Sequence, residues 1–216
     1  MAAKKDMPWG TLLLGGLWAG LLALALWWLY PDRPIPPELQ GIARPHPKLL
    51  QPFELVDQRH QAFTREGLRD KWSFVFFGYT YCPDICPTTL STLSAVTSRL
   101  RRESQRISND QVVFVSVDPA RDRPEVLADY VQYFSETFIG VTGDKRAIDN
   151  LARQFNAGYM KEDETPAGDY LVSHASTIFL VDPDLRLVAA FPPPHDPDTL
   201  VEQYRLIRAM QSEIKG

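Results

Sequence analysis

The pattern of apolar and polar residues divides the chain into three parts. An unbroken apolar run near the N-terminus is followed by a proline-rich stretch, and beyond residue 48 strand-like runs alternate with helix-like stripes. Short apolar runs, typical of buried strands, cover 72–77, 111–117, 176–181 and 185–191. Apolar residues at helical spacings of three and four recur over 87–102, 124–134, 144–155 and 197–213. This alternation predicts an α/β domain.

The order of these segments narrows the prediction. The last two strand-like runs are joined by Asp182-Pro183-Asp184, a typical turn sequence, so they predict a hairpin. Residues 53–63 predict a smaller hairpin upstream. Strand, helix, strand, helix, then a closing hairpin and helix is the order of a thioredoxin-like α/β fold, which we expect over residues 49–216.

The N-terminal apolar run predicts a transmembrane anchor at residues 7–31. No charged residue occurs between Asp6 and Asp32, and four of the five tryptophans lie in this gap. As a helix, Trp9–Tyr30 would span about 33 Å, enough to cross a bilayer. A cleaved signal peptide is the alternative, because Ala23-Leu24-Ala25 has the form of a cleavage site. The apolar run continues past that site, which favours an uncleaved anchor.

Charges near the anchor predict its orientation. Lys4 and Lys5 favour a cytoplasmic tail at residues 1–6, so the remainder would face a periplasm-like space. No Arg- and Ser-rich transit peptide precedes the anchor, which favours a bacterial inner membrane. Prolines are dense over 32–48, which we expect to be an extended linker between the membrane and the domain.

Both cysteines of the chain stand together at the end of the predicted central strand. Cys82 and Cys86 are four residues apart, a spacing that places both sulfurs on one side of a helical turn. Pro83 and Pro87 lack an N–H, so the pair must lie at the opening turns of the helix, where the helix dipole favours thiolate. Such a dithiol closes a disulfide reversibly or binds a soft metal. The alternative is a purely structural role, either as a disulfide that crosslinks the loop or as two buried thiols.

The four histidines of the chain are the candidates for a third ligand. His46, His60 and His195 fall in predicted linker, turn and loop segments, where we expect solvated side chains. His174 stands immediately before a predicted core strand, and a thioredoxin-like sheet would bring it beside the dithiol. From position alone, a metal ligand and a structural histidine remain equally open.

Three motifs in this order resemble the Sco/SenC family, over essentially the whole domain from Phe53 to the C-terminus together with the single anchor. The motifs are Phe77-Gly-Tyr-Thr-x-Cys82-Pro-Asp-Ile-Cys86-Pro, Ser116-Val-Asp118-Pro119-x-Arg121-Asp122 and Tyr170-Leu-Val-x-His174. The resemblance implies a thioredoxin-like fold that binds one copper ion per domain, as Cu(I) or Cu(II), with Cys82, Cys86 and His174 as ligands. Thiolates favour Cu(I), and an added imidazole makes Cu(II) tolerable.

The same resemblance implies a role in assembling the dinuclear copper centre of cytochrome c oxidase. The expected function is delivery of copper; the alternative is a thiol-disulfide reductase in which Cys82 and Cys86 are the redox pair. The expected partners are the copper-bearing subunit of the oxidase and, beyond it, other periplasmic copper chaperones or thiol reductases. Thioredoxins usually have a cis-proline just before the strand that corresponds to the one predicted after His174. This chain has no proline there, which favours metal handling over general thiol exchange.

Several polar residues near the motifs have two interpretations. Asp118, Arg121 and Asp122 form either a partner-docking or site-adjacent loop, or an ordinary strand-to-helix turn. Asp84, between the cysteines, faces a partner or simply begins the helix. Ser173 departs from the family pattern, in which an acidic residue often precedes the histidine, so an acid that orients the imidazole is in doubt here.

Composition and spacing weigh against other functions. A net charge of −4 argues against nucleic-acid binding. A peroxiredoxin-type peroxidase needs a threonine at a fixed distance from the attacking cysteine, and Thr80 lies too close to Cys82. A sensor that signals through the anchor would have only the short tail at residues 1–6 to act with. Copper delivery is therefore the expected function.

Overall fold

The computed structural model of the chain describes residues 35–103, 109–166 and 168–215, together with seven scattered positions between 15 and 25. The chain separates into two units, Met1–Ile35 and Pro36–Gly216. The named elements, all in the second unit, are η1 (Pro37–Leu39), β1 (Ala43–Leu49), β2 (Glu54–Asp57), β3 (Ala62–Thr64), η2 (Arg65–Leu68), β4 (Trp72–Gly78), α2 (Ile85–Glu103), β5 (Asp110–Ser116), α3 (Pro124–Phe134), β6 (Ile139–Thr142), α4 (Lys145–Phe155), β7 (Tyr159–Lys161), β8 (Val172–His174), β9 (Ile178–Val181), β10 (Arg186–Phe191) and α5 (Pro197–Lys215).

Within the described residues, eight strands form one mixed sheet in the order β1-β10-β9-β4-β5-β6-β2-β3, and β7 and β8 form a separate pair. The neighbours β4, β5 and β6 are parallel, whereas β9 runs antiparallel to both β4 and β10. Every residue of β4 is buried, as the continuous apolar run predicted. The strand order, the two hairpins and the helices confirm the predicted thioredoxin-like α/β fold.

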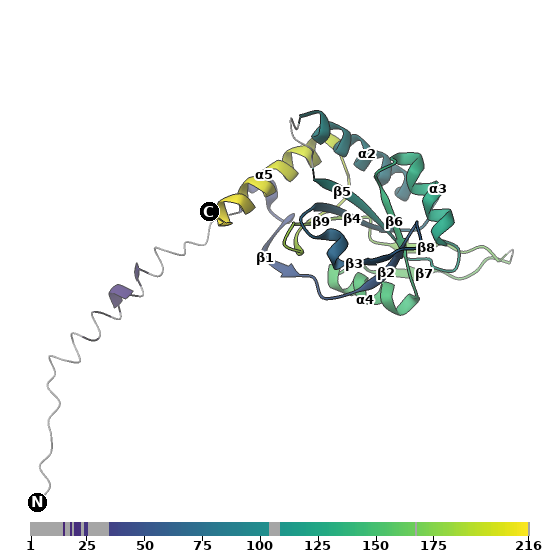
Figure 1. Ribbon diagram of the computed structural model, residues 1–216, viewed down its shortest axis with the longest axis horizontal. Coiled ribbons are helices and arrows are strands. Elements are labelled where there is room, and N and C mark those ends of the chain that lie inside the picture. Colours follow the sequence, from purple (N-terminus) through teal and green to yellow (C-terminus); the bar gives the residue numbers. More distant parts are fainter. Residues whose placement is uncertain are drawn as a thin grey trace, which may run out of the picture. The chain divides into compact units, whose positions relative to one another are not determined.

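Successive side chains of a strand point to opposite faces of the sheet, so a strand that is apolar throughout makes both faces apolar. Helices cover both of these faces. On one face, the ring of Phe74 lies 5.2 Å from the ring of Tyr204 in α5. On the other, the ring of Phe77 lies 5.4 Å from the ring of Phe155 in α4. Figure 1 shows α4 on the side of the sheet opposite α2, α3 and α5. The core therefore has two apolar layers with β4 between them.

The sheet begins earlier in the chain than expected. Strand β1 (Ala43–Leu49) pairs antiparallel with β10 and falls mostly inside the predicted linker, residues 32–48. The pairing is irregular between Ala43 and Lys48, and Pro45 and Pro47 lie in that interval. An edge strand tolerates prolines because one of its sides needs no hydrogen-bonding partner. Proline content alone therefore does not separate an edge strand from a linker.

The predicted anchor, residues 7–31, and the tail before it fall mostly outside the described residues. Among the helices that the structure describes, none combines the length and the apolarity needed to cross a membrane.

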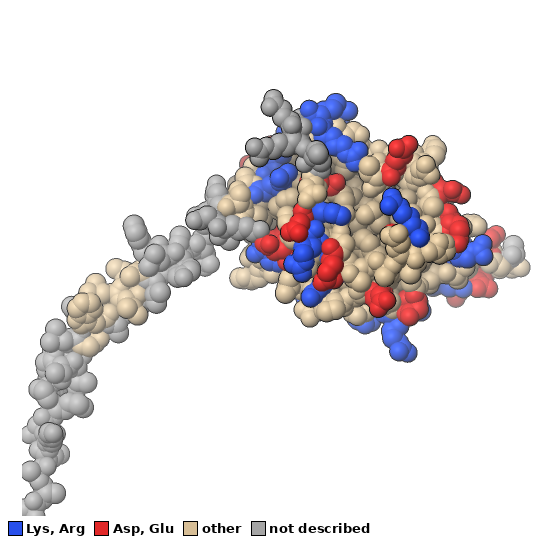
Figure 2. Space-filling view, in the orientation of Figure 1, with Lys and Arg blue, Asp and Glu red and all other residues tan. Residues whose placement is uncertain are grey.

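Figure 2 shows basic and acidic side chains interspersed over the visible face of the domain. The charges on this face are therefore mixed in sign, in keeping with the small net charge of −4.

Candidate metal centre

The loop from β4 to α2 contains both cysteines. Cys82 lies in the loop and is partly exposed, whereas Cys86 lies in the first turn of α2 and is buried. The backbone N–H of Cys86 donates to the Sγ of Cys82 across 3.4 Å. An N–H at the start of a helix has no partner within the helix, so it is free to stabilise a sulfur anion. The predicted placement at the opening turn is confirmed.

Gly78 ends β4 and leaves room for the buried thiol. A Cβ at this position would lie 2.6 Å from the Sγ of Cys86 and 2.8 Å from the Cε2 of Phe114. Side-chain carbons do not approach other heavy atoms so closely, so a residue larger than glycine would displace the start of α2 or the ring. Gly78 therefore sets how closely Cys86 packs against the end of the central strand.

His174 ends β8 and completes the cluster. Its Nε2 lies 3.3 Å from the Sγ of Cys86, and its Nδ1 lies 3.2 Å from the carbonyl oxygen of Ala175. A carbonyl oxygen only accepts, so Nδ1 is the donor and the lone pair of Nε2 faces the thiol in the neutral ring. The rings of Phe76 and Tyr79 meet the imidazole edge-on, with centroids 5.8 and 5.9 Å away. The backbone carbonyl of Ala175 thus orients the imidazole. It takes the role for which the sequence offers no acidic residue directly before His174.

The three side chains form a soft-metal donor set. The Sγ atoms of Cys82 and Cys86 and a ring nitrogen of His174 all lie within 4.8 Å of one another. Two thiolates and one imidazole suit copper in either oxidation state. A structural zinc site normally has four protein ligands, and no other His, Cys, Asp or Glu joins this cluster in the described part of the chain.

The pKa values of the two thiols are shifted in opposite directions. A hydrogen bond from the Cys86 thiol, together with one from the backbone N–H of Cys86, lowers the pKa of Cys82 to about 3. The same thiol hydrogen bond, together with burial, raises the pKa of Cys86 far above its usual range. The metal-free pair is therefore a thiolate that accepts a hydrogen bond from a buried thiol. Loading a metal onto both sulfurs requires Cys86 to lose its proton.

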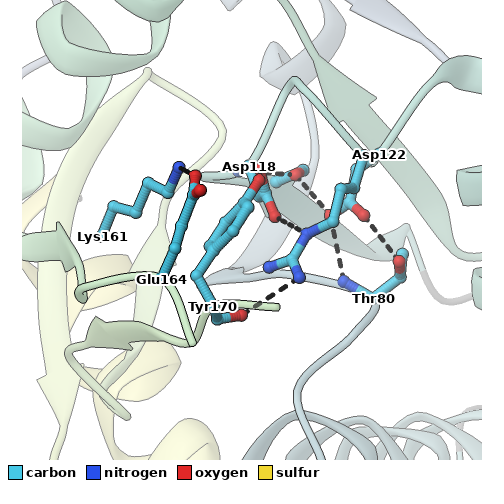
Figure 3. A network of polar contacts seen from close by, with 8 residues as sticks. Thr80, Asp118, Asp122, Lys161, Glu164 and Tyr170 are labelled. Carbon is cyan, nitrogen blue, oxygen red and sulfur yellow. Dashed lines mark hydrogen bonds and ion pairs between the residues drawn. The ribbon is translucent and has the colours of Figure 1, made fainter. Parts of the chain in front are cut away.

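Asp122 supports the loop that leads to Cys82. Its carboxylate accepts from the backbone N–H of Thr80 at 3.0 Å, from the Thr80 hydroxyl at 2.6 Å and from the Ser116 hydroxyl at 2.6 Å. Figure 3 shows Thr80 and Asp122 facing each other across these contacts. Burial raises the pKa of Asp122 above its ordinary value, and the hydrogen bonds act against that rise. The turn after β5 is therefore tied to the loop that contains Cys82.

The residues considered for partner docking divide by burial. Asp118 and Asp122 are buried, at 4% and 0% exposure, so they adjoin the site and present no exposed carboxylate to a partner. Arg121 is mostly buried beside Asp118. Asp84 is exposed directly before α2, where its backbone carbonyl accepts from the N–H of Thr88 at 3.2 Å. Among these four residues, Asp84 alone combines exposure with a position between the two cysteines.

The other histidines lie away from the cluster. His46 is exposed in β1, and His60 is exposed in a turn with its Nε2 2.8 Å from a carboxylate oxygen of Glu125. His195 is only half-buried, not fully solvated, and its Nε2 donates to the carbonyl oxygen of Phe191 at 3.1 Å. Burial lowers the pKa of His195. Of the four histidines, His174 is the one placed at the dithiol.

Sequence reasoning did not assign supporting roles to Gly78, Thr80, Ser116 and Tyr170. All four lie inside the three quoted motifs, which was the available signal. Thr80 contacts Asp122 and Tyr170 contacts Asp118, each in a different motif, so spacing within one motif does not reveal these two contacts.

Comparisons with known proteins agree with this geometry. The family model described as SCO1/SenC matches residues 42–208. A protein of Stutzerimonas stutzeri is 40% identical over 140 residues, which cover 65% of this chain and 67% of that protein. The copper-bound crystal structure of ScoI from Arabidopsis thaliana is 35% identical, covers 74% of this chain and 98% of its own, and has a TM-score of 0.69.

A more distant solved structure has the same fold. BsSco, described as a member of the Sco family of cytochrome c oxidase assembly proteins with a disulfide switch, is 20% identical, with a TM-score of 0.59. The match covers 74% of this chain and 94% of that one. At this identity the likeness bears on the fold alone.

Proposed function

The chain belongs to the SCO1/SenC family, and from this premise we propose that it binds copper and delivers it to the dinuclear copper centre of cytochrome c oxidase during assembly. The observation that carries the proposal is the cluster of Cys82, Cys86 and His174, whose donor atoms lie within 4.8 Å of one another. Copper is the cargo of this site, and a relative with 35% identity has been solved with copper bound.

The cluster suits a carrier that must release its metal. Three protein ligands leave a coordination position open, and Cys82 is a partly exposed residue of the loop before α2. A thiol or imidazole of the copper-bearing oxidase subunit can then enter as a new ligand before a carrier ligand leaves. Periplasmic copper chaperones would load the site by the same exchange in reverse.

The deciding experiment measures copper on the reduced full-length chain in competition with a Cu(I) chelator of known affinity. We expect one tightly bound copper per chain. Removing one of three ligands in His174→Ala should weaken binding by about 100-fold or more, since even losing a group that only supports a ligand costs 10- to 100-fold. His46→Ala, an exposed histidine outside the cluster, is the matched control and should bind as the parent does. Binding indifferent to His174 would refute the proposed site.

One observation favours a second function, thiol-disulfide exchange that keeps the copper-ligand cysteines of the oxidase subunit reduced. Cys82 and Cys86 are free thiols at the start of a helix, and the lowered pKa of Cys82 makes it a thiolate at neutral pH. In that function His174→Ala leaves reduction of a disulfide substrate largely intact, while Cys82→Ser and Cys86→Ser abolish it. Loss of copper binding without loss of exchange would separate the two functions.

We also propose that residues 7–31 anchor the protein in a bacterial inner membrane with the domain in the periplasm. The uncharged run and the lysines before it support this proposal. In cell fractionation the full chain should stay in the membrane after an alkaline wash, and added protease should cleave the domain only once the outer membrane is opened. Release by the alkaline wash would contradict the anchor.

A further inference from the structure

Arg121 lies between the two segments that bear the candidate ligands. Its Nε is 2.5 Å from Oδ2 of Asp118, and its Nη1 donates to the carbonyl oxygen of Tyr170 at 3.1 Å. The central carbon of the guanidinium lies 3.6 Å from the centroid of the Tyr170 ring and 4.8 Å from that of Tyr81. Tyr81 directly precedes Cys82, and Tyr170 lies four residues before His174. One side chain thus contacts a near neighbour of two candidate ligands.

Tyr170 is held at several points. Besides its contacts with Arg121, its hydroxyl donates to Oδ1 of Asp118 at 2.7 Å, and the Nζ of Lys161 lies 3.8 Å from the centroid of its ring. Figure 3 shows the ring of Tyr170 directed toward Asp118, with Lys161 and Glu164 close to it. Lys161 belongs to β7, whose partner β8 ends at His174. The position of Tyr170 is therefore coupled to the short sheet that presents the imidazole.

Stability alone is a weak reason for this arrangement. The Arg121 side chain is 19% exposed and that of Asp118 is 5% exposed, so most of a charged pair has been removed from water. The Nη2 atom of Arg121 is buried without a hydrogen-bond acceptor. Buried ion pairs often contribute no more to stability than apolar residues of similar volume, and an unmatched donor adds a cost. Apolar residues could not make the contacts that Arg121 makes at the same time with the Asp118 carboxylate, the Tyr170 carbonyl and the rings of Tyr81 and Tyr170.

We propose that Arg121 is a positioning residue that fixes the segment bearing His174 against the loop bearing Cys82. The inference rests on the proposed function for its consequence, since it is the copper site that this connection keeps assembled. With the connection in place, the imidazole stays beside the Cys86 thiol without metal, so binding does not have to order the histidine segment. Preorganised ligands bind more tightly because the ordering cost has already been met.

The test compares Arg121→Met with Arg208→Met in the full-length reduced chain. Arg208 also faces two rings, those of Trp72 and Tyr204 at 5.8 and 5.5 Å, but it lies on α5 and touches neither segment. We expect Arg121→Met to weaken Cu(I) retention by about 10- to 100-fold. We also expect it to reduce the thiolate-to-copper charge-transfer absorption of the Cu(II) form. Arg208→Met should leave both unchanged. Equal copper affinity and equal spectra for Arg121→Met and the parent would overturn the proposal.

Two further variants separate positioning from folding. Arg121→Lys keeps the charge and the contact with Asp118 but lacks the planar fork, so it should recover only part of the copper affinity. Asp118→Asn combined with Arg121→Met leaves no uncompensated charge, so it should melt near the parent temperature while still losing copper. A double variant that melts like the parent and retains copper equally well would refute the positioning role.

A copper-free measurement keeps this inference distinct from the proposed function. Amide hydrogen exchange of the metal-free protein over residues 170–175 should be faster in Arg121→Met than in the parent and unchanged in Arg208→Met. If the parent binds no copper, the proposed function fails while the exchange result still decides the coupling. If exchange over these residues is the same in all three proteins, the coupling itself is refuted.

Discussion

At the scale of single residues, two cysteines of one chain acquire opposite acidities from their places in the loop and the helix. Cys82 accepts hydrogen bonds and has a pKa of about 3, whereas the pKa of the buried Cys86 is strongly raised. The lowered value means that Cys82 is still a thiolate at pH 5, where an ordinary thiol is almost fully protonated. We therefore predict that iodoacetamide modifies Cys82 at pH 5 nearly as fast as at pH 7, with Cys86 spared.

Mass spectrometry of the reduced, copper-free protein checks this prediction. The control is Cys86→Ala, which removes the thiol that donates to Cys82 and should make the modification rate of Cys82 fall more steeply between pH 7 and pH 5. A parent rate that rises about tenfold per pH unit between pH 5 and pH 7 would contradict the prediction, because that slope belongs to a thiol titrating above this range.

The residues that bear the chemistry were the most predictable part of the site. Cys82, Cys86 and His174 can be identified as candidates by their residue type, by their positions next to apolar runs and by the small number of cysteines and histidines in the chain. The supporting role of Tyr170 depends on contacts with Asp118 and Arg121, about fifty positions earlier. Such contacts follow from the packing of two loops and leave no periodic trace in either segment.

At the scale of elements, the long periodic segments and both hairpins were predicted well, whereas the short strands β6, β7 and β8 were not. The predicted helix over 144–155 became α4 (Lys145–Phe155), with Asp144 capping it by accepting from the N–H of Ala147. Strand β6 (Ile139–Thr142) has four residues and β7 and β8 have three each, too few for an alternating pattern to stand out. Those short strands matter because β8 is the one that presents His174.

The close approach of β4 and α2 yields a prediction of its own. Gly78→Ala would place a Cβ 2.6 Å from the Sγ of Cys86, so α2 or the thiol must shift. We predict a loss of about 1–3 kcal/mol in the free energy of unfolding, the usual cost of overpacking, and weaker copper binding. Gly158→Ala is the control, since its Cβ would meet nothing within 4 Å. Urea unfolding of both variants measures the difference, and equal midpoints would show that the contact relaxes without cost.

At the scale of the whole molecule, the fold brings three separate parts of the chain to one point. The cysteines follow β4, the Asp118–Asp122 turn follows β5 next to it in the sheet, and His174 arrives on the separate β7–β8 pair. The parallel pairing of β4 and β5 explains the first two, because parallel strands end at the same edge of a sheet. The third was expected from the thioredoxin-like order, although the small sheet that delivers it was not.

This convergence predicts that copper stabilises the domain as a unit. A ligand that binds only the folded state adds about 4 kcal/mol at a free concentration a thousand times its dissociation constant. For a domain of this size, that corresponds to a rise of roughly 10 °C in melting temperature. Removing the metal with a Cu(I) chelator should reverse the rise, and Cys86→Ser should abolish it because only one thiolate and one imidazole of the cluster then remain to bind copper. His46→Ala should keep the full rise, so equal shifts in the Cys86→Ser and His46→Ala proteins would mean that copper acts elsewhere on the chain.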